Sequence, residues 1–461
     1  MTVRWRRGRT LSEWADQAAR EYPARLAMAV FAAVVAIFTL LLSLPFATAS
    51  GERAPFADAL FTATSAVCIT GLTVVDTGSY WSDFGRVVIL TGIKVGGLGV
   101  MTIASLLGLA VSKRIGLTQR LLTASEVKAS KLGDVGTLLR IIILTATAIE
   151  VAIALVLLPR FLVLGHDLGE AVWHSVFYGI SAFNNAGFVP TTDGLAPYAA
   201  DWLVVVPIGV GVFIGSLGFP VIHNLLQTRG SGRRWFASWS LHSKLTITTS
   251  VALVAAAMVL IGALEWSNER TMGSQDFWHR LLTVFFTAVN PRSGGFSTVD
   301  AGALRQETWL VTDALMFVGG GSASTAGGIR VTTLAVMLLA ILAEARGDRD
   351  IDVFGRRIPR DTLRLAIAVV FMGATAVLVS CIALLQLTDH DLGPVLFEVI
   401  SAFATVGLST GITPGLPDAA KYWLCALMYV GRVGLISLLG ALALRDRRRI
   451  VRFPEERPIV G

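Results

Sequence analysis

The chain has 461 residues, of which 54% are hydrophobic and 15% are charged, and its formal net charge is +7. An ordinary soluble domain has about one quarter charged residues, so this composition excludes the soluble globular class. The mean hydropathy is +0.67, and apolar stretches near the length of about 20 residues that a helix needs to cross a membrane recur along the whole chain. We therefore expect an integral membrane protein.

Eight apolar segments are predicted to be membrane-spanning helices. In chain order they cover residues 25–48, 84–111, 138–164, 202–226, 242–264, 308–342, 363–387 and 420–444. The start of the chain contains the basic stretch MTVRWRRGRT, then Glu13 and Asp16, and lacks the apolar core and small-residue cleavage site of a signal peptide. We therefore expect this segment to stay on the mature chain.

Lysine and arginine are distributed unevenly between the two sides of these spans. With successive loops on alternate sides, 28 of the 39 basic residues fall on the side of the N-terminus. The positive-inside rule then places both termini in the cytoplasm, in the cytoplasmic membrane of a bacterium. Basic loops beside membrane helices explain the net charge, so no nucleic-acid partner is expected. The opposite side is acidic, which would raise the local concentration of cations.

The shorter segments between paired spans share one pattern. In each, a phenylalanine is followed ten residues later by a glycine: Phe61 and Gly71, Phe177 and Gly187, Phe285 and Gly295, Phe397 and Gly407. The glycines are 116, 108 and 112 residues apart, far more than the period of most repeat proteins. The pattern predicts four repeated units, residues 25–112, 138–226, 242–345 and 363–444, between a cytoplasmic N-terminus (1–24) and a cytoplasmic tail (445–461).

Each of these segments begins with helix-compatible residues and ends in small, polar or glycine residues. This predicts a short re-entrant helix followed by an irregular strand. Non-helical backbone inside a membrane is found only where it is buried in protein or lines a water-filled cavity. Four such strands around one axis would turn carbonyl oxygens toward a dehydrated monovalent cation, because glycine permits positive φ and close approach. Glycine also permits close packing between membrane helices, and for any single glycine this explanation is the stronger one. Four phenylalanine–glycine matches at one spacing favour a pore instead.

Two other classes of protein fit the sequence poorly. A secondary transporter with inverted repeats would show two corresponding halves, whereas this unit recurs four times in the same internal order. An enzyme would need a reactive constellation, but the six histidines form no metal-spaced pair and Cys68, Cys381 and Cys425 form no CxxC site. Cys68 lies in the first glycine segment, where we expect a buried free thiol. The chain is therefore not expected to be an enzyme.

Several motifs resemble a known family. The glycine segments read TSAVCITGLTVVDTG, SAFNNAGF, NPRSGGFSTVD and SAFATVGLSTG, and the second helix of each unit contains, in turn, IKVGGLG (93–99), GSLGFP (215–220), GGGSASTAGG (319–328) and GRVG (431–434). Over nearly its whole length the chain resembles the Trk/Ktr/HKT superfamily of potassium transporters. With eight spans and no additional N-terminal pair, it is most similar to the KtrB-type membrane subunits within it.

The resemblance implies a potassium filter built from the four glycine segments. Its residues would be Thr70, Gly71, Ala186, Gly187, Gly294, Gly295, Val406 and Gly407, with potassium at the carbonyls of Gly71, Gly187, Gly295 and Gly407. In the family a serine at the first of these glycine positions accompanies sodium permeation, so Gly71 implies selectivity for potassium. A role for sodium as an activator stays open.

The resemblance also implies a gating loop in the middle of the sixth span. It would consist of Gly319, Gly320, Gly321, Ser322, Ala323, Ser324, Thr325, Ala326, Gly327 and Gly328. Each glycine weakens a helix by about 1 kcal/mol relative to alanine, so a break is expected there. Arg432 matches an arginine of the last helix that faces the same cavity. A structural ion pair between Arg432 and Glu150 is the alternative role.

The same resemblance implies partners for the chain, and Lys94 departs from the pattern of the family. The implied assembly is a homodimer with a separate cytosolic KtrA-type nucleotide-binding ring, since this chain has no GxGxxG motif opening a βαβ unit and should bind no nucleotide itself. The basic loops and the tail RDRRRIVRFPEERP could dock that ring or lipid headgroups. Lys94 stands where glutamine is more usual. It could repel cations below the filter, pair with an acid, or extend away from the pore.

Overall fold

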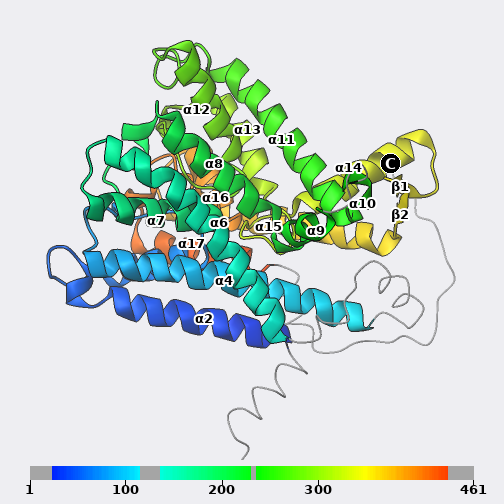
Figure 1. Cartoon of the computed structure of the whole chain (residues 1–461), viewed down its shortest axis with the longest axis horizontal. Coiled ribbons are helices and arrows are strands. Elements are labelled where there is room, and N and C mark those ends of the chain that lie inside the picture. The colour runs from blue at the N-terminus through cyan, green and yellow to red at the C-terminus, as the bar shows by residue number, and fades with distance from the viewer. Residues whose placement is uncertain (1–22, 115–134, 230–234, 435–461) are drawn as a thin grey trace, which may run out of the picture.

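Long helices and shorter apolar helices alternate along the chain (Figure 1). The computed structural model describes residues 23–114, 135–229 and 235–434. Its helices are α2 (Pro23–Leu42), α3 (Phe56–Val67), α4 (Asp83–Arg114), α6 (Val135–Val163), α7 (Leu168–Asn184), α8 (Trp202–Leu217), α9 (Phe219–Thr228), α10 (Trp235–Ser238), α11 (Leu241–Glu265), α12 (Phe277–Val289), α13 (Gln306–Phe317), α14 (Val331–Arg346), α15 (Arg360–Leu387), α16 (Leu392–Phe403) and α17 (Asp418–Val433), with short 3-10 turns at Pro45–Ala47, Ala196–Tyr198, Ala301–Ala303 and Thr413–Gly415.

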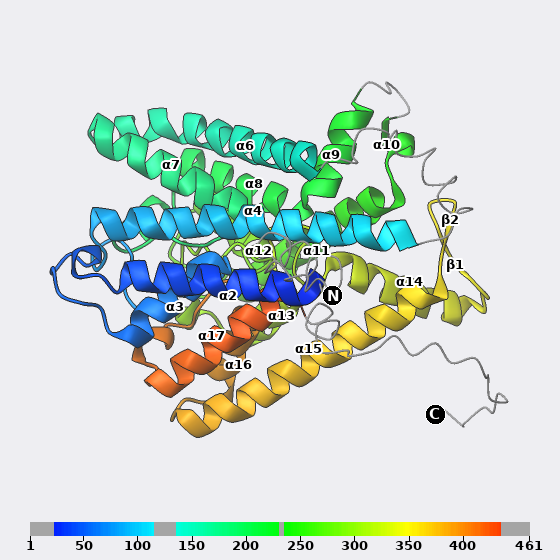
Figure 2. The ribbon, with the colours of Figure 1, turned by 90° about the horizontal axis from the view of Figure 1, so that it is seen from below.

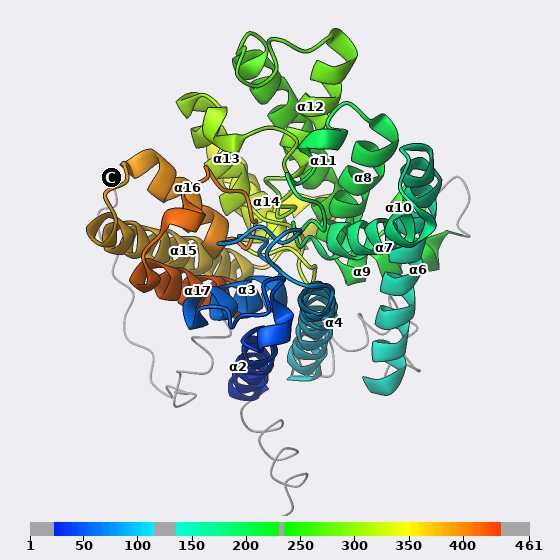
Figure 3. The ribbon, with the colours of Figure 1, turned by 90° about the vertical axis from the view of Figure 1, so that its left-hand side faces the viewer.

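Four groups of three helices surround a common centre, as Figure 3 shows. The groups are α2, α3 and α4; α6, α7 and α8; α11, α12 and α13; and α15, α16 and α17. The third helix of each group packs on the middle, shorter helix of the next: α4 on α7, α8 on α12, α13 on α16, and α17 on α3. The last of these contacts joins the end of the described chain to its beginning, so the arrangement is closed.

The predicted spans agree with the helices in position but not always in form. Within the described residues, three helices are long and apolar enough to cross a membrane, namely Leu139–Val163, α11 and α15. The predicted span 202–226 is not one straight helix: α8 and α9 meet at a bend of 94°, where Gly218 has φ +92°. Counted as one span, this pair is a fourth. The other predicted spans correspond to α2, α4, the broken pair α13 and α14, and α17. In the described residues these helices do not meet the length and hydropathy expected of a membrane span together.

Some sequence predictions lie outside the described residues. These are most of the N-terminal segment, the basic connection between α4 and α6, and the last residues of the predicted eighth span together with the tail. One feature was not predicted: a two-stranded hairpin of β1 (Ile351–Val353) and β2 (Arg356–Ile358) follows α14 (Figure 2). Its turn is Phe354-Gly355, where φ is +52° and +73°. Two left-handed residues in succession are the usual form of a tight antiparallel hairpin.

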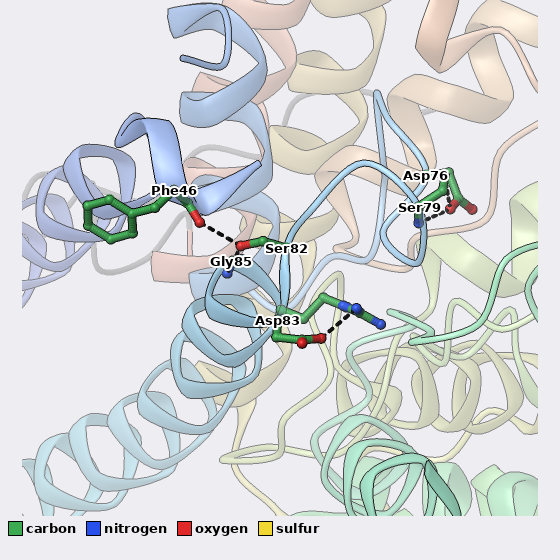
Figure 4. Close-up of polar contacts among 7 residues, drawn as sticks. Phe46, Asp76, Ser79, Ser82, Asp83 and Gly85 are labelled. Atoms are coloured by element: carbon green, nitrogen blue, oxygen red, sulfur yellow. Dashed lines mark hydrogen bonds and ion pairs between the residues drawn. The ribbon is translucent and has the colours of Figure 1, made fainter. Parts of the chain in front are cut away.

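The start of α4 is fixed by a serine. Ser82 precedes the helix, and its hydroxyl accepts the backbone N–H of Gly85 at 3.2 Å, which satisfies one of the free donors of the first turn. The same hydroxyl donates to the carbonyl oxygen of Phe46 at 2.7 Å (Figure 4). Because Phe46 lies just after α2, this bond ties the end of α2 to the beginning of α4. Asp83 in the first turn pairs with Arg86 at 2.6 Å.

Candidate ion-conducting site

The four short helices α3, α7, α12 and α16 end just before the repeat glycines, and the backbone after each one turns in the same way. In every segment the glycine and the residue two positions before it have positive φ, while the residue between them does not: Ile69 (56°) and Gly71 (94°), Asn185 (59°) and Gly187 (68°), Ser293 (73°) and Gly295 (73°), Thr405 (47°) and Gly407 (95°). Alternation of left- and right-handed residues gathers successive N–H groups on one side of a chain. It therefore leaves the carbonyl groups on the other side.

Serine side chains and carbonyls receive those N–H groups in the first and fourth segments. The carbonyl oxygen of Ser65 accepts the N–H of Thr70 at 2.7 Å, and its hydroxyl accepts the N–H of Gly71 at 3.0 Å. Ser401 binds Val406 and Gly407 in the same way, at 2.8 and 3.1 Å. In a trans peptide the N–H and the preceding C=O point in opposite directions. The carbonyls of Ile69 and Thr70 consequently point away from Ser65.

The third segment binds its backbone N–H groups through a different residue. It has Val289-Asn290 where the others have Ser-Ala. The backbone carbonyl of Asn290 accepts the N–H of Gly294 at 2.7 Å, and its side-chain oxygen accepts the N–H of Phe296 at 3.2 Å. Asn290 thus binds the residues on either side of the ring glycine, Gly294 and Phe296, whereas Ser65 and Ser401 bind the ring glycine itself.

The four glycines lie against one another in a closed ring. A Cβ atom built on any of them would meet the backbone of a neighbouring segment at less than ordinary contact distance: Gly71 to Ala186 O, 2.4 Å; Gly187 to Gly295 Cα, 2.9 Å; Gly295 to Val406 O, 2.5 Å; Gly407 to Thr70 O, 2.2 Å. The structure therefore brings together all of the predicted filter glycines, at distances that admit no side chain.

Glycines in the following helices hold this ring from behind. A Cβ atom on Gly96 of α4, Gly215 of α8 or Gly431 of α17 would lie 2.0, 2.0 or 1.9 Å from the carbonyl oxygen of Val67, Phe183 or Phe403, respectively. Each of these carbonyls belongs to the residue four positions before a ring glycine. Three positions further on, α8 and α17 have reached Gly218 and Gly434, both with positive φ, whereas α4 continues as a helix through Gly99.

The segment 318–330 is not helical and lies directly against the ring segments, between α13 and α14. The N–H of Gly327 bonds the hydroxyl of Ser293 at 3.2 Å, and the hydroxyl of Thr325 bonds the carbonyl oxygen of Phe183 at 3.4 Å. A Cβ atom on Gly327 would lie 2.1 Å from the hydroxyl oxygen of Thr405. The predicted break in the sixth span is present, and glycine permits its contact with the ring.

The other side of this segment is held by α8 and α9. The N–H of Gly321 donates to the carbonyl oxygen of Ser216 at 2.7 Å, and the carbonyl oxygen of Ala323 accepts the N–H of Phe219 at 3.3 Å. These bonds use backbone groups that the break between α8 and α9 leaves free. The backbone groups left free at the break between α8 and α9 and those of segment 318–330 therefore form hydrogen bonds with each other.

Two arginines also hold the segment, one buried and one partly buried. Arg432 is 3% exposed, and its guanidinium donates to the carbonyl oxygen of Thr325. Arg330 donates to the carbonyl oxygens of Ala326 and Gly321. The alternative ion pair between Arg432 and Glu150 is wrong, because Glu150 is bound by Lys94 instead.

Lys94 also differs from one of its predicted roles. Its ammonium group pairs with Glu150 of α6 and donates to the hydroxyl of Thr147 at 3.3 Å. A paired lysine does not act as a free positive charge below the ring, so the predicted repulsion of cations by Lys94 is wrong. The costly intramembrane charge is compensated by an acid from the neighbouring helix group.

Some residues of this site had no role in the sequence-based prediction. Ser65, Ser401 and Asn290 stand in the repeated glycine segments, but the pattern assigns them no function. The available signal is a hydrogen-bonding side chain five or six positions before each glycine. Arg330 could have been found as a charge directly after the glycine-rich stretch. Cys68 is buried and free, as predicted.

Apolar helices grouped around a ring of glycine-ended loops define a membrane transport protein for ions, not an enzyme. The chain belongs to the TrkH family of cation transport proteins, which matches residues 10–447. It is similar to Ktr system potassium uptake protein B of Bacillus subtilis, with 37% identity over 95% of this chain and 96% of that protein. It is also similar to the potassium/sodium uptake protein NtpJ of Enterococcus hirae, with 32% identity over 95% of this chain and 97% of that one.

A solved structure supports the fold. The crystal structure of the potassium transporter TrkH from Vibrio parahaemolyticus aligns with a TM-score of 0.68, over 90% of this chain and 85% of that one, at 18% sequence identity. The likeness extends over nearly the whole chain, so the two proteins share a fold.

Proposed function

We propose that this protein takes up potassium across the bacterial cytoplasmic membrane through a filter formed by its four glycine segments. The closed ring of Gly71, Gly187, Gly295 and Gly407 is the observation that supports this most directly. A partly dehydrated cation needs oxygen atoms to replace its water, and backbone carbonyls held on one side of four segments supply them. Relatives named as potassium uptake proteins point to the same ion.

Eight membrane passages in four repeated units, with both termini in the cytoplasm, belong to this proposal. In it α2, α4, α6, the pair α8 and α9, α11, the pair α13 and α14, α15 and α17 cross the membrane, while α3, α7, α12 and α16 enter it and return. The cyclic packing of each third helix on the next short helix is what such a pseudo-fourfold pore requires.

The segment Gly319–Gly328 and Arg432 are proposed as the gate. The segment lies against the ring, and Arg432 holds it through the carbonyl of Thr325. A guanidinium near the path also opposes a cation: two unit charges 4 Å apart interact by about 4 kcal/mol at an effective dielectric constant of 20. Opening would require the segment to move and the charge to leave or be screened.

Regulation by a separate cytosolic nucleotide-binding ring, on a homodimer of this chain, completes the proposal. A relative named as a Ktr system protein supports it, since a system implies further components. Growth of a bacterium deficient in potassium uptake, at low potassium, with this chain alone and with a KtrA-type partner, tests the regulation. Growth that never depends on the partner would contradict it.

The transport function is tested with purified protein in liposomes. Potassium-loaded vesicles should show potassium flux well above protein-free vesicles, and sodium flux should be smaller. NtpJ is named as a potassium/sodium uptake protein, so sodium must be measured both as a permeant ion and as an activator of potassium flux. Absence of any cation flux, with and without the partner, would exclude the proposed function.

A further inference from the structure

A charged network connects the first helix group to the second, just behind the second ring segment. Glu150 of α6 is 4% exposed. One of its carboxylate oxygens pairs with the ammonium group of Lys94 on α4, and the other accepts the side-chain amide of Asn184 at 2.8 Å. The carboxylate thus has one positive partner and one neutral donor.

Asn184 is the residue through which this network reaches the ring. It is the last residue of α7 and lies three positions before Gly187. Its amide also donates to the carbonyl oxygen of Ile180 at 2.8 Å. A Cβ atom on Gly97 of α4 would lie 2.0 Å from its side-chain oxygen, so α4 packs directly on the other side of the amide. The side chain is therefore fixed by α6 and by α4 at once.

The third helix group contains a similar connection built from different residues. Arg292 lies three positions before Gly295 and is 1% exposed. Its guanidinium donates to the hydroxyl and the carbonyl oxygen of Ser250 on α11, at 2.9 and 3.3 Å. The same position in the first and fourth segments is occupied by Cys68 and Ala404, neither of which carries a strong donor. Two of the four ring segments are thus bound to the first helix of their own group.

We infer that Glu150, neutralised by Lys94, is a positioning residue that holds the second ring segment through Asn184. This rests on the proposed function, because it gives the network a part in the geometry of the filter. Asn184 is followed at once by Asn185 in a left-handed conformation, so a displacement of the Asn184 backbone, which the network restrains, would shift the carbonyls of Asn185 and Ala186. A buried carboxylate left without its donor or its cation would be unfavourable, which keeps the network closed.

The test uses two double variants, each of which removes the charges of Lys94 and Glu150. Lys94→Met with Glu150→Gln keeps an oxygen that can accept the Asn184 amide. Lys94→Met with Glu150→Leu removes that oxygen. We expect the first variant to keep the wild-type ratio of potassium to sodium flux in liposomes, and the second to lower it by about tenfold, which corresponds to the loss of one buried hydrogen bond.

A matched control removes another ion pair from the same helix. Arg160 of α6 pairs with Asp201 at 2.6 Å, away from Asn184. The double variant Arg160→Gln, Asp201→Asn should keep the wild-type flux ratio. If the two Lys94 variants behave alike, whether both unchanged or both impaired, the hydrogen bond to Asn184 is not what matters and the inference is overturned.

A single variant covers the case in which the leucine variant does not accumulate in the membrane. Asn184→Ala leaves the Lys94–Glu150 pair in place and should lower the flux ratio to the same extent. An unchanged ratio in this variant overturns the inference. If Gly71→Ser lowers the ratio while the Glu150 and Asn184 variants do not, the filter stands and only the positioning role fails. A wild-type protein without preference for potassium would overturn both.

Discussion

Two separate requirements explain glycine at the ring positions. Gly71 has φ +94°, a conformation that an ordinary L-residue adopts at a cost of about 1–2 kcal/mol. There is also no space for a side chain at position 71, because a Cβ atom would lie 2.4 Å from the carbonyl oxygen of Ala186. The first requirement concerns stability, whereas the second concerns the carbonyl that we propose as an ion ligand. The two can be separated by experiment.

Gly71→Ser should weaken the preference for potassium over sodium. The new Cβ must displace the backbone of Ala186, which widens or tilts the ring at that side. Relative uptake of the two ions by vesicles containing the variant measures this. Gly411→Ser is the control, since Gly411 has the same φ of +94° but nothing within 4 Å of its Cβ position. Equal preference in the wild type and the Gly71 variant would exclude a role of this contact in selectivity.

Arg432→Gln should raise potassium flux and make it less dependent on the nucleotide-binding partner. The change removes the charge and weakens the bond to the carbonyl of Thr325. Arg432→Lys should be intermediate, because lysine keeps the charge but not the planar set of donors. Flux at matched membrane abundance, with and without the partner, is the measurement. Wild-type flux in a well-folded Arg432→Gln protein would remove this residue from the gate.

Sequence reasoning identified which residues of the site are unusual better than it identified their partners. The glycines and Arg432 could be found because their chemistry is out of place in a membrane helix. The partners of Lys94 and Asn184 could not be found, because they depend on which faces of α4, α6 and α7 meet. Helix rotation and register between residues 34 and 56 positions apart are not encoded in a local pattern.

At the scale of elements, the helices follow from hydropathy, and the interruptions follow from glycine only in part. The five glycines within 319–328 predict the break that the structure shows at 318–330. The bend between α8 and α9 is not predicted, because a single glycine with a following Phe-Pro reads equally well as a tolerated residue in an apolar helix. The hairpin of β1 and β2 escaped prediction because its strands have three residues each and half of their side chains are charged.

Deletion of Ser322–Ala326 should raise basal potassium flux. These residues include the carbonyl that Arg432 binds and the carbonyl of Ala323 that receives the N–H of Phe219. The flanking bonds of Gly321 and Val331 would remain, so the deletion removes the obstruction but keeps the segment attached to α8. Flux through vesicles at matched protein content is the measurement. Equal or lower flux would identify the segment as a packing element.

At the scale of the whole molecule, closure of the four groups depends on contacts between distant parts of the chain. Lys421 of α17 pairs with Asp58 of α3 at 2.8 Å, across 363 positions in sequence. The ring itself is held by backbone contacts between all four groups. Potassium bound between the carbonyls would add a further contact common to all of them.

Potassium should therefore raise the apparent melting temperature of the purified protein by a few degrees relative to a sodium salt at equal ionic strength. A ligand at about 100 times its dissociation constant stabilises the folded state by about 2.7 kcal/mol. Gly71→Ser should reduce the difference between the two salts, whereas Gly411→Ser should leave it unchanged. Identical melting in the two salts would mean that the ring does not distinguish the ions at equilibrium.

The unbroken course of α4 affects how such a molecule can open. Below the ring, α8 turns at Gly218 and α13 ends at Phe317, while α4 continues without interruption to Arg114. Backbone that already lacks helical bonds can be displaced at lower cost than an intact helix. We expect the inner half of the passage to be stationary along α4 and to yield along α8 and α13. Its widening would then be eccentric, with the ions leaving along a route displaced away from α4 and tilted relative to the axis on which they entered.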